Sequence, residues 1–310
     1  MAGKVLHILN GDSLSEGLQL LDLGGDTLVW REMLCAGPVT VEVGGDRFFE
    51  SRSSFLNQFF EVSESRYHDG FIKPLTEITN LDQYEEINLW FEYDLFCHIN
   101  LLGSLAWISQ HSFSGKVFHI CSGRVKGVSK LLGLSELTED QLRDHFRHKK
   151  LLNSEDLEIA NDIWLCYTND DPSAILPKIP RRSSFDYLSN CLKSHIERFP
   201  SIETGLNALE THVLQLIETH SIKSEHQLCG YALSQQGYYG YGDSQIMRVI
   251  RNLRPYFSTV EGHLKLNGIG IKLLNKEINV LNQLQSEYSF GGAKKYDWLY
   301  DAANNKLIKR

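Results

Sequence analysis

Charged and polar side chains cluster directly after an apolar segment near the start of this 310-residue chain. The stretch Asn10-Gly11-Asp12-Ser13 follows the apolar residues 5–9 and precedes a helical pattern of leucines. A carboxylate at this position could bind ribose hydroxyls, an amine or Mg²⁺ through water. The free N–H groups at the start of a helix could bind an anion. The residue types in this stretch therefore favour ligand binding and do not define a reaction.

Two further polar pairs stand in the same position relative to an apolar segment. Arg31 and Glu32 follow the mostly apolar residues 27–30, and Glu92 and Asp94 follow the mostly apolar residues 87–91. Arginine suits a phosphate or a carboxylate, so the pairs together predict a site for a nucleotide-like, anionic small molecule. The candidate ligand-binding residues are Asn10, Gly11, Asp12, Ser13, Arg31, Glu32, Glu92, Asp94, His98 and Arg124. The chain has no G-x-G-x-x-G and no G-x-x-x-x-G-K-[ST] motif, so the identity of any cofactor stays open.

The same residues also have purely structural explanations. Ser13 and Glu16 have the spacing of a capping box, and Asp94 is a plausible helix N-cap. Arg31 could neutralise Asp12 without any ligand. The structural explanation is favoured for single residues, and a binding site is favoured for the cluster as a whole.

The elements that would position this cluster alternate between apolar segments and helical patterns. We predict strands over residues 4–10, 27–30, 86–92 and 116–121. Short strands interleaved with helices predict an α/β fold with a mostly parallel sheet and flanking helices, Rossmann- or flavodoxin-like. The carboxyl ends of parallel strands share one edge of the sheet, so the three polar pairs are expected to meet there.

The rest of the chain has a different character, and we expect four parts. They are the α/β domain over 1–170, a connecting helix over 171–200, a mainly helical, winged-helix-like domain over 201–275, and a C-terminal helix and hairpin tail over 276–310. Three helices followed by a hairpin are typical of the winged-helix layout.

The candidate recognition helix of the third part carries Arg248, Arg251 and Arg254 at three-residue spacing. Residues 201–275 nevertheless contain equal numbers of basic and acidic residues. A DNA-binding module is normally more basic. A protein-contact or structural role is therefore favoured over DNA binding, which stays an alternative.

Composition excludes several classes of protein. The chain is 42% hydrophobic and 23% charged with a formal net charge of -8, which argues against a protein that mainly coats nucleic acid or anionic membrane. Six cysteines without a C-x-x-C pair indicate reduced thiols in the cytoplasm. No signal peptide and no apolar run of membrane-spanning length are apparent. His145 and His148 lack a matching pair of ligands, so no metal site is expected.

The block Gly11-Asp12-Ser13-Leu14 resembles the first block of the GDSL (SGNH) esterases, in which the serine is the nucleophile. That resemblance implies an Asp-x-x-His pair near the C-terminus as the catalytic base, and an oxyanion block. Neither is present in this sequence, and a serine without an oriented base is a weak nucleophile. A serine hydrolase is the least favoured alternative.

A longer resemblance depends on three spaced motifs. These are His7-x-x-Asn10-Gly11-Asp12-Ser13, then Trp30-Arg31-Glu32 with Gly37-Pro38-Val39, then Leu89-Trp90-Phe91-Glu92-x-Asp94-Leu95-Phe96 with Asn100-Leu101-Leu102. They resemble a bacterial domain-of-unknown-function family that pairs such an α/β domain with a helical C-terminal region. The resemblance implies that Asp12, Arg31, Glu32, Glu92 and Asp94 belong to one site. This chain has Cys97 and His98 where the family has Asp and Gln, which puts a role for His98 in doubt.

Overall fold

The computed structural model describes residues 4–78 and 80–310, and its central feature is a five-stranded sheet of order β2-β1-β3-β4-β7. The strands β1 (Lys4–Leu9), β2 (Asp26–Val29), β3 (Tyr84–Trp90) and β4 (Lys116–Ile120) are parallel and lie where strands are predicted. The short β7 (Lys150–Leu151) pairs with β4 in the antiparallel direction. The predicted mixed α/β fold with a mostly parallel sheet is confirmed.

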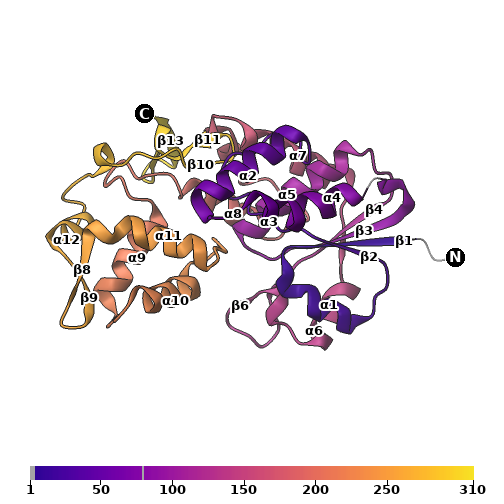
Figure 1. The fold of residues 1–310 in the computed structure, drawn as a ribbon, viewed down its shortest axis with the longest axis horizontal. Coiled ribbons are helices and arrows are strands. Elements are labelled where there is room, and N and C mark those ends of the chain that lie inside the picture. Colours follow the sequence, from indigo (N-terminus) through magenta and orange to yellow (C-terminus); the bar gives the residue numbers. More distant parts are fainter. Residues whose placement is uncertain (1–3, 79) are drawn as a thin grey trace.

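Helices cover both faces of this sheet (Figure 1). The helices α1 (Ser15–Leu21) and α6 (Glu139–Arg147) lie on one face, and α5 (Leu95–Gln110) and α7 (Ser154–Thr168) lie on the other. Each face has its own cluster of buried apolar side chains. Because both faces are buried, the parallel strands are nearly continuous apolar segments, which is why the sequence reveals them.

Further helices extend the larger of the two cores. α2 (Asp46–Phe60), α3 (Glu64–Tyr67) and α4 (Lys73–Glu77) pack beside α5, and a π-helical turn joins α3 to α4. Two-residue strands β5 (Gly123–Arg124) and β6 (Leu131–Leu132) form a small hairpin on the opposite side.

The connecting helix expected over 171–200 is only partly present. A 3-10 helix covers Pro172–Lys178, and α8 covers Leu188–Ile196. Between them, the Ser184 N–H binds the Asp156 carboxylate, and Lys150 pairs with Asp186 at 2.6 Å. These tertiary contacts hold the intervening residues outside the helix.

The C-terminal part contains the predicted order of three helices and a hairpin. The helices are α9 (Ala208–Thr219), α10 (Glu225–Gln235) and α11 (Asp243–Leu253), and the hairpin is β8 (Phe257–Val260) with β9 (His263–Leu266), followed by α12 (Gly268–Leu274). Within the described part of the chain, no helix has both the length and the apolar character needed to cross a membrane.

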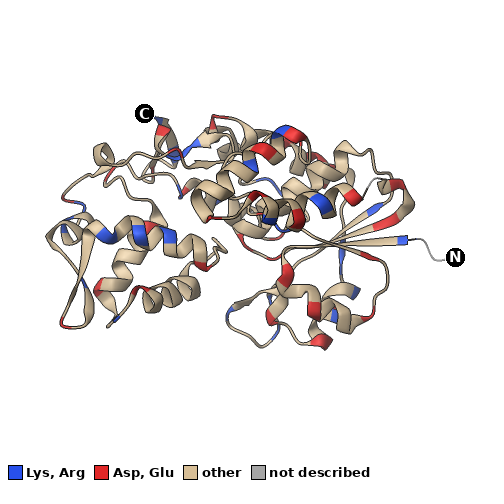
Figure 2. Cartoon of the chain, in the orientation of Figure 1, with Lys and Arg blue, Asp and Glu red and all other residues tan. Residues whose placement is uncertain are grey.

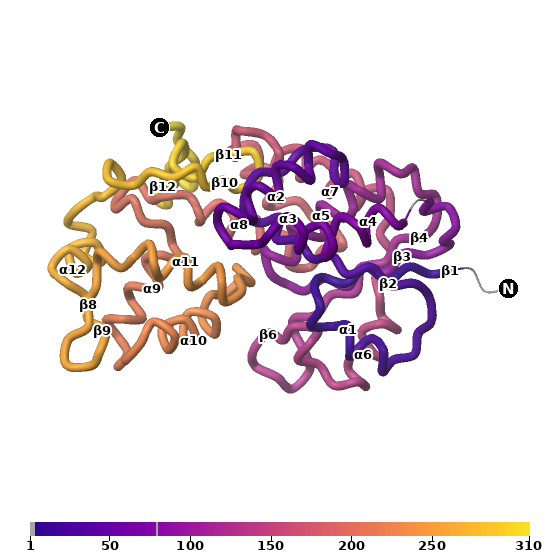
Figure 3. The backbone as a smooth tube through the Cα atoms, viewed as in Figure 1, coloured from indigo at the N-terminus to yellow at the C-terminus, as the bar shows by residue number. Residues whose placement is uncertain are grey.

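Residues 276–310 correct one prediction. They contain no α-helix, only 3-10 turns and two hairpins, β10 (Ser289–Phe290) with β11 (Ala293–Lys294) and β12 (Trp298–Asp301) with β13 (Lys306–Lys309). The tail returns to lie beside α8 and α2 (Figure 3), and Phe290 forms a parallel bridge with Gly37. Residues 276–310 are held in place by their contacts with the α/β part and not by the internal hydrogen bonds of a helix.

The C-terminal part also contacts the first turn of α5. The carbonyls of Tyr238 and Tyr239 accept hydrogen bonds from the Leu95 and Phe96 N–H groups, at 2.8 and 3.2 Å. Next to them, Gly240 has a φ of 65° and lies so close to Asp94 that a Cβ atom would come within 2.0 Å of the carboxyl carbon. We call residues 236–242 the clamp loop.

We expect Gly240→Ala to displace the clamp loop, because the added methyl group meets Asp94 and the left-handed backbone disfavours alanine. Hydrogen exchange at the Leu95 and Phe96 amides should become faster. Unfolding free energy should fall by at least about 1 kcal/mol. Gly230→Ala is the control, since nothing lies within 4 Å of its position in α10. Unchanged protection of both amides in Gly240→Ala would contradict this role.

Candidate functional site

The three predicted polar pairs do reach one edge of the sheet. β1 lies between β2 and β3, and Leu9 is in register with Val29 on one side and with Trp90 on the other. The chain passes from β1 to β2 on one side and then crosses back past β1 to β3 on the other side, so a crevice is expected beyond these strand ends. The side chains at this edge nevertheless fall into three distinct environments.

Asp12 and Arg31 form an exposed, bidentate ion pair. The Arg31 Nε and Nη2 atoms donate to the Asp12 carboxylate at 2.7–3.0 Å, and Nη1 donates to the Gly70 carbonyl at 3.0 Å. The hydrogen bonds from Arg31 hold the pKa of Asp12 below its usual range. The structure therefore contains the ion pair with Asp12 that would explain Arg31 without any ligand.

Ser13 does not have the capping role considered for it. It is exposed and lies inside a 3-10 turn, Asp12–Leu14, whose N-cap is Gly11. The predicted capping box with Glu16 is wrong, because the helix α1 starts after Leu14 without a side-chain cap.

Glu32 lies in a fully buried network. Its carboxylate binds Arg52 at 2.7 Å and accepts a hydrogen bond from the Tyr67 hydroxyl, also at 2.7 Å. Both side chains of the ion pair are inaccessible to solvent. The remaining Arg52 donors bind the carbonyls of Met33, Ala36 and Pro38. Glu32 therefore fixes the segment after β2 and is not available to a ligand as a free carboxylate.

Two asparagines join the strand ends to α5. The Asn100 amide donates to the Asn10 side chain and to the Glu32 carbonyl at 2.7 and 2.6 Å, and it accepts from the Leu34 N–H. Asn10 in turn donates to the Cys97 sulfur at 3.0 Å. Sequence reasoning missed Arg52 and Asn100, although a lone amide inside the apolar helix α5 was a usable signal.

Glu92, Asp94 and Cys97 form a third group. Asp94 caps α5 as predicted, accepting from the Cys97 N–H at 2.8 Å, and Glu92 accepts from the Leu134 N–H at 2.6 Å. One potential ligand atom from each of the three lies within 4.8 Å of the others, so the group could hold a metal ion. Burial, with the nearby Asp94 charge, raises the pKa of Glu92 to about 7.

The last two candidates, His98 and Arg124, take different positions. His98 is 1% exposed and its Nδ1 donates to the Asp94 carbonyl, and burial lowers its pKa to about 4. Arg124 is exposed in β5 and lines a separate cavity of about 220 Å³ with His119, His145 and His148. Neither residue lines the cavity that contains Arg31.

Two cavities flank the first turn of α5. One, of about 470 Å³, lies beyond the ends of β1 and β2, and we call it the edge pocket. It is lined by Gly11, Asp12, Trp30, Arg31, Glu32, Met33, Leu56, Phe60, Val62, Arg66, Tyr67, Gly70, Phe71, Phe96 and Ser244. The other, of about 700 Å³, lies between the clamp loop and the β5–β6 hairpin, with Asp94 and Lys130 in its wall.

The predicted DNA-contact arginines do not share one free face. Figure 2 shows basic residues as blue bands along α11. Arg254 pairs with Glu225 at 2.7 Å, whereas Arg248 packs on the rings of Phe59 and Tyr288 at 4.5 and 5.2 Å. Residues three apart on a helix diverge by about 60°, so the two successive steps from Arg248 to Arg254 do not make a straight stripe.

Comparisons with known proteins identify no family for this chain. No family model matches it, and no curated protein matches its sequence. Among solved structures, the DNA-binding, cleavage and re-ligation domain of Plasmodium falciparum topoisomerase II is similar with a TM-score of 0.46 and 15% identity, over 81% of this chain and 42% of that one. The chain thus spans less than half of that structure, and this degree of likeness does not establish a common fold.

We expect Arg52→Gln to destabilise the protein by about 3–5 kcal/mol, because it leaves the Glu32 carboxylate buried without its partner. Urea denaturation measures the loss. Arg31→Gln is the matched control, since it removes an exposed arginine–carboxylate pair and should cost no more than about 1 kcal/mol. Equal losses in the two variants would show that the buried pair has no special role.

The raised pKa of Glu92 gives a second prediction. The Glu92 carboxyl group binds its proton more tightly in the folded state than in the unfolded state. The protein therefore loses folding stability as pH rises from the pKa of the unfolded state towards about 7. Glu92→Gln should therefore gain stability relative to wild type between pH 5 and pH 8. Chemical denaturation at several pH values measures this difference, and a constant difference would argue against the raised pKa.

Proposed function

We propose that the α/β domain binds an anionic, nucleotide-like small molecule in the edge pocket. The observation that carries this proposal is the composition of that pocket. Apolar walls, formed by Trp30, Leu56, Phe60, Phe71 and Phe96, surround a small number of charged groups. Ligand sites typically combine concave apolar walls with a few polar groups that fix orientation.

The charge in the pocket favours an anion. Arg66 is exposed and forms no ion pair with any residue of 4–78 or 80–310, while Arg31 keeps N–H donors beyond those bound to Asp12. Glu32 is neutralised by Arg52. Two guanidinium groups and one exposed carboxylate therefore face the ligand. Arg66 and Arg31 would bind a phosphate or carboxylate, and Asp12 would accept hydroxyl hydrogen bonds.

We further propose that residues 201–275 form a winged-helix-like module that regulates this site. Ser244 at the start of α11 lines the edge pocket, and the clamp loop caps the turn of α5 that forms its far wall. A ligand that alters this wall would change the contact with the module. DNA binding finds less support, because Arg248 and Arg254 are engaged within the chain.

Three wider inferences accompany this proposal. The sheet order supports a Rossmann- or flavodoxin-like relationship, and the three sequence motifs support membership of the domain-of-unknown-function family that they resemble. We infer a cytoplasmic protein from its cysteine usage. The sequence lacks the Asp-x-x-His pair and the oxyanion block that a serine hydrolase of this kind needs, so we do not propose that alternative.

Calorimetric titration of the full chain with AMP, ATP and adenosine tests the proposed function. We expect the phosphorylated compounds to bind and adenosine to bind much more weakly. Arg66→Gln should weaken binding about 10-fold or more, since a charge-assisted hydrogen bond contributes about 1.5–3 kcal/mol.

Arg147→Gln is a matched control, because Arg147 is exposed on α6, outside the residues that line the edge pocket. The Arg147→Gln variant should bind AMP and ATP with the same affinity as the wild type. Binding of AMP that is insensitive to both Arg66→Gln and Asp12→Asn would refute a nucleotide site at the sheet edge.

A further inference from the structure

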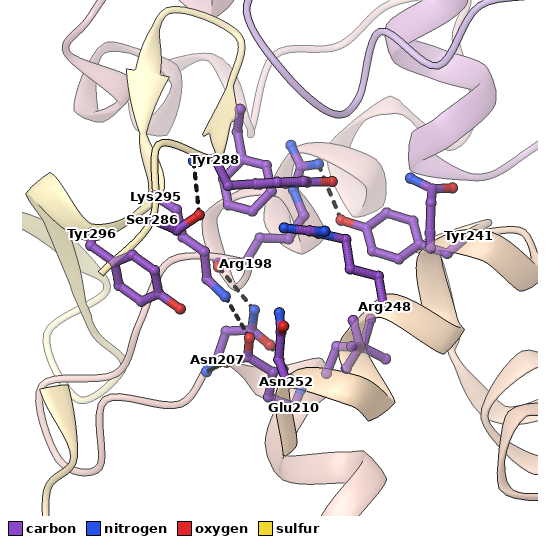
Figure 4. A pocket seen from close by; sticks show the side chains of 14 residues that line it. Arg198, Asn207, Glu210, Tyr241, Arg248, Asn252, Ser286, Tyr288, Lys295 and Tyr296 are labelled. Atoms are coloured by element: carbon purple, nitrogen blue, oxygen red, sulfur yellow. Dashed lines mark hydrogen bonds and ion pairs between the residues drawn. The ribbon is translucent and has the colours of Figure 1, made fainter. Parts of the chain in front are cut away.

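A further cavity, of about 50 Å³, lies where α8, α9 and α11 meet the C-terminal segment. We call it the junction cavity. Figure 4 shows Arg248 reaching into it from α11, with Tyr296 on the opposite side. Its polar lining comprises Arg198, Asn207, Glu210, Tyr241, Gln245, Arg248, Asn252, Ser286, Tyr288, Lys295 and Tyr296.

Arg198 is a buried cation without a carboxylate partner. It is 1% exposed, and no described acidic residue lies within ion-pair distance of it. Its Nη atoms donate to the Cys35 carbonyl, to His195 and to the Tyr241 hydroxyl, while its Nε has no hydrogen-bond partner among residues 4–78 and 80–310. Burial holds the pKa of His195 far below its usual value, so that ring is neutral. A buried charge without a counter-ion is costly.

Arg248 adds a second cation with free donors. Its guanidinium group packs between Phe59 and Tyr288, yet it has no hydrogen bond to any residue that the structure describes. The five N–H groups of arginine are strong donors that rarely stay unpaired where solvent is limited. They lie in the wall of the same cavity as Arg198.

The remaining charges do not balance these two arginines. Lys295 is buried and pairs with Glu210, which is the single carboxylate among the described residues of the lining. The cavity wall therefore has an excess of two positive charges. Its neutral members, such as Tyr241, Asn252 and Ser286, supply hydroxyl and amide donors that suit a multivalent oxygen anion.

We propose that the junction cavity is a binding site for a phosphate group, held by Arg198 and Arg248. A water molecule needs roughly 10–15 Å³ of such space, so the cavity admits an anion of a few oxygen atoms and excludes a whole nucleoside. The phosphate is either free or the end of a small phosphomonoester whose remainder lies outside, past the exposed Asn252. This site is separate from the edge pocket and does not depend on it.

The site links three parts of the chain. Arg198 follows α8, Arg248 belongs to α11, and Lys295 belongs to the C-terminal tail. A bound anion would neutralise the mutual repulsion of Arg198 and Arg248 and stabilise the packing of these parts. The inference therefore predicts that phosphate both binds and raises the thermal stability of the full chain.

Calorimetric titration of the full-length protein with inorganic phosphate, AMP and adenosine tests the inference. We expect inorganic phosphate to bind with a dissociation constant of roughly 1 mM or tighter. Arg248→Gln should weaken it at least about 10-fold, as expected for a lost charge-assisted hydrogen bond. Arg251→Gln, which alters an exposed arginine of the same helix, should bind phosphate as wild type does. A preference for AMP over phosphate that Arg248→Gln removes would identify a phosphomonoester as the source.

The variants also separate this site from the edge pocket. Phosphate affinity that falls in Arg248→Gln and not in Arg66→Gln supports the junction cavity. Affinity that falls in Arg66→Gln alone assigns the phosphate to the edge pocket and overturns this inference while leaving the proposed function intact. Absence of binding, or equal affinity in wild type and Arg248→Gln, also overturns it. Circular dichroism spectra that coincide for both variants exclude misfolding as the cause.

Discussion

The buried pair of Glu32 and Arg52 constrains the segment that follows β2, and much of the structure depends on that segment. Because both side chains are removed from water, each needs the other and the surrounding carbonyls to offset the cost of desolvation. The pair thereby fixes the path of residues 33–38, against which α2, α5 and the C-terminal tail all pack. Arg31 stands directly before this fixed segment, so its guanidinium group reaches the edge pocket from a rigid support.

The first turn of α5 has a comparable role between the two cavities. Asp94 satisfies one of its N–H groups, and the clamp loop satisfies two others. In an open α/β sheet this helix terminus would be the natural anion site, but here backbone carbonyls from the C-terminal part occupy it. Positive charge is instead supplied by side chains, from Arg31 and Arg66 on one side and from Arg198 and Arg248 in the junction cavity.

Local patterns in the sequence predicted the elements that depend on local rules. The parallel strands and the Asp94 cap follow from apolar runs and capping residues, and both are present. The partners of Glu32 could not be predicted, because Arg52 and Tyr67 approach it only through the packing of α2 and α3 on the sheet. The prediction that Glu92 and Asp94 lie at the edge of the sheet was likewise correct. Residues that follow neighbouring strands nevertheless need not line the same cavity.

The bridge between Gly37 and Phe290 joins residues from nearly opposite ends of the chain. Closing such a loop has a large entropic cost that must be met before the contact gives any stability. During synthesis, the segment after β2 therefore emerges long before its partner strand exists. The α/β part is left with an unpaired edge beside Gly37 until the tail arrives, which makes the arrival of residues 289–291 a late step in the maturation of the fold.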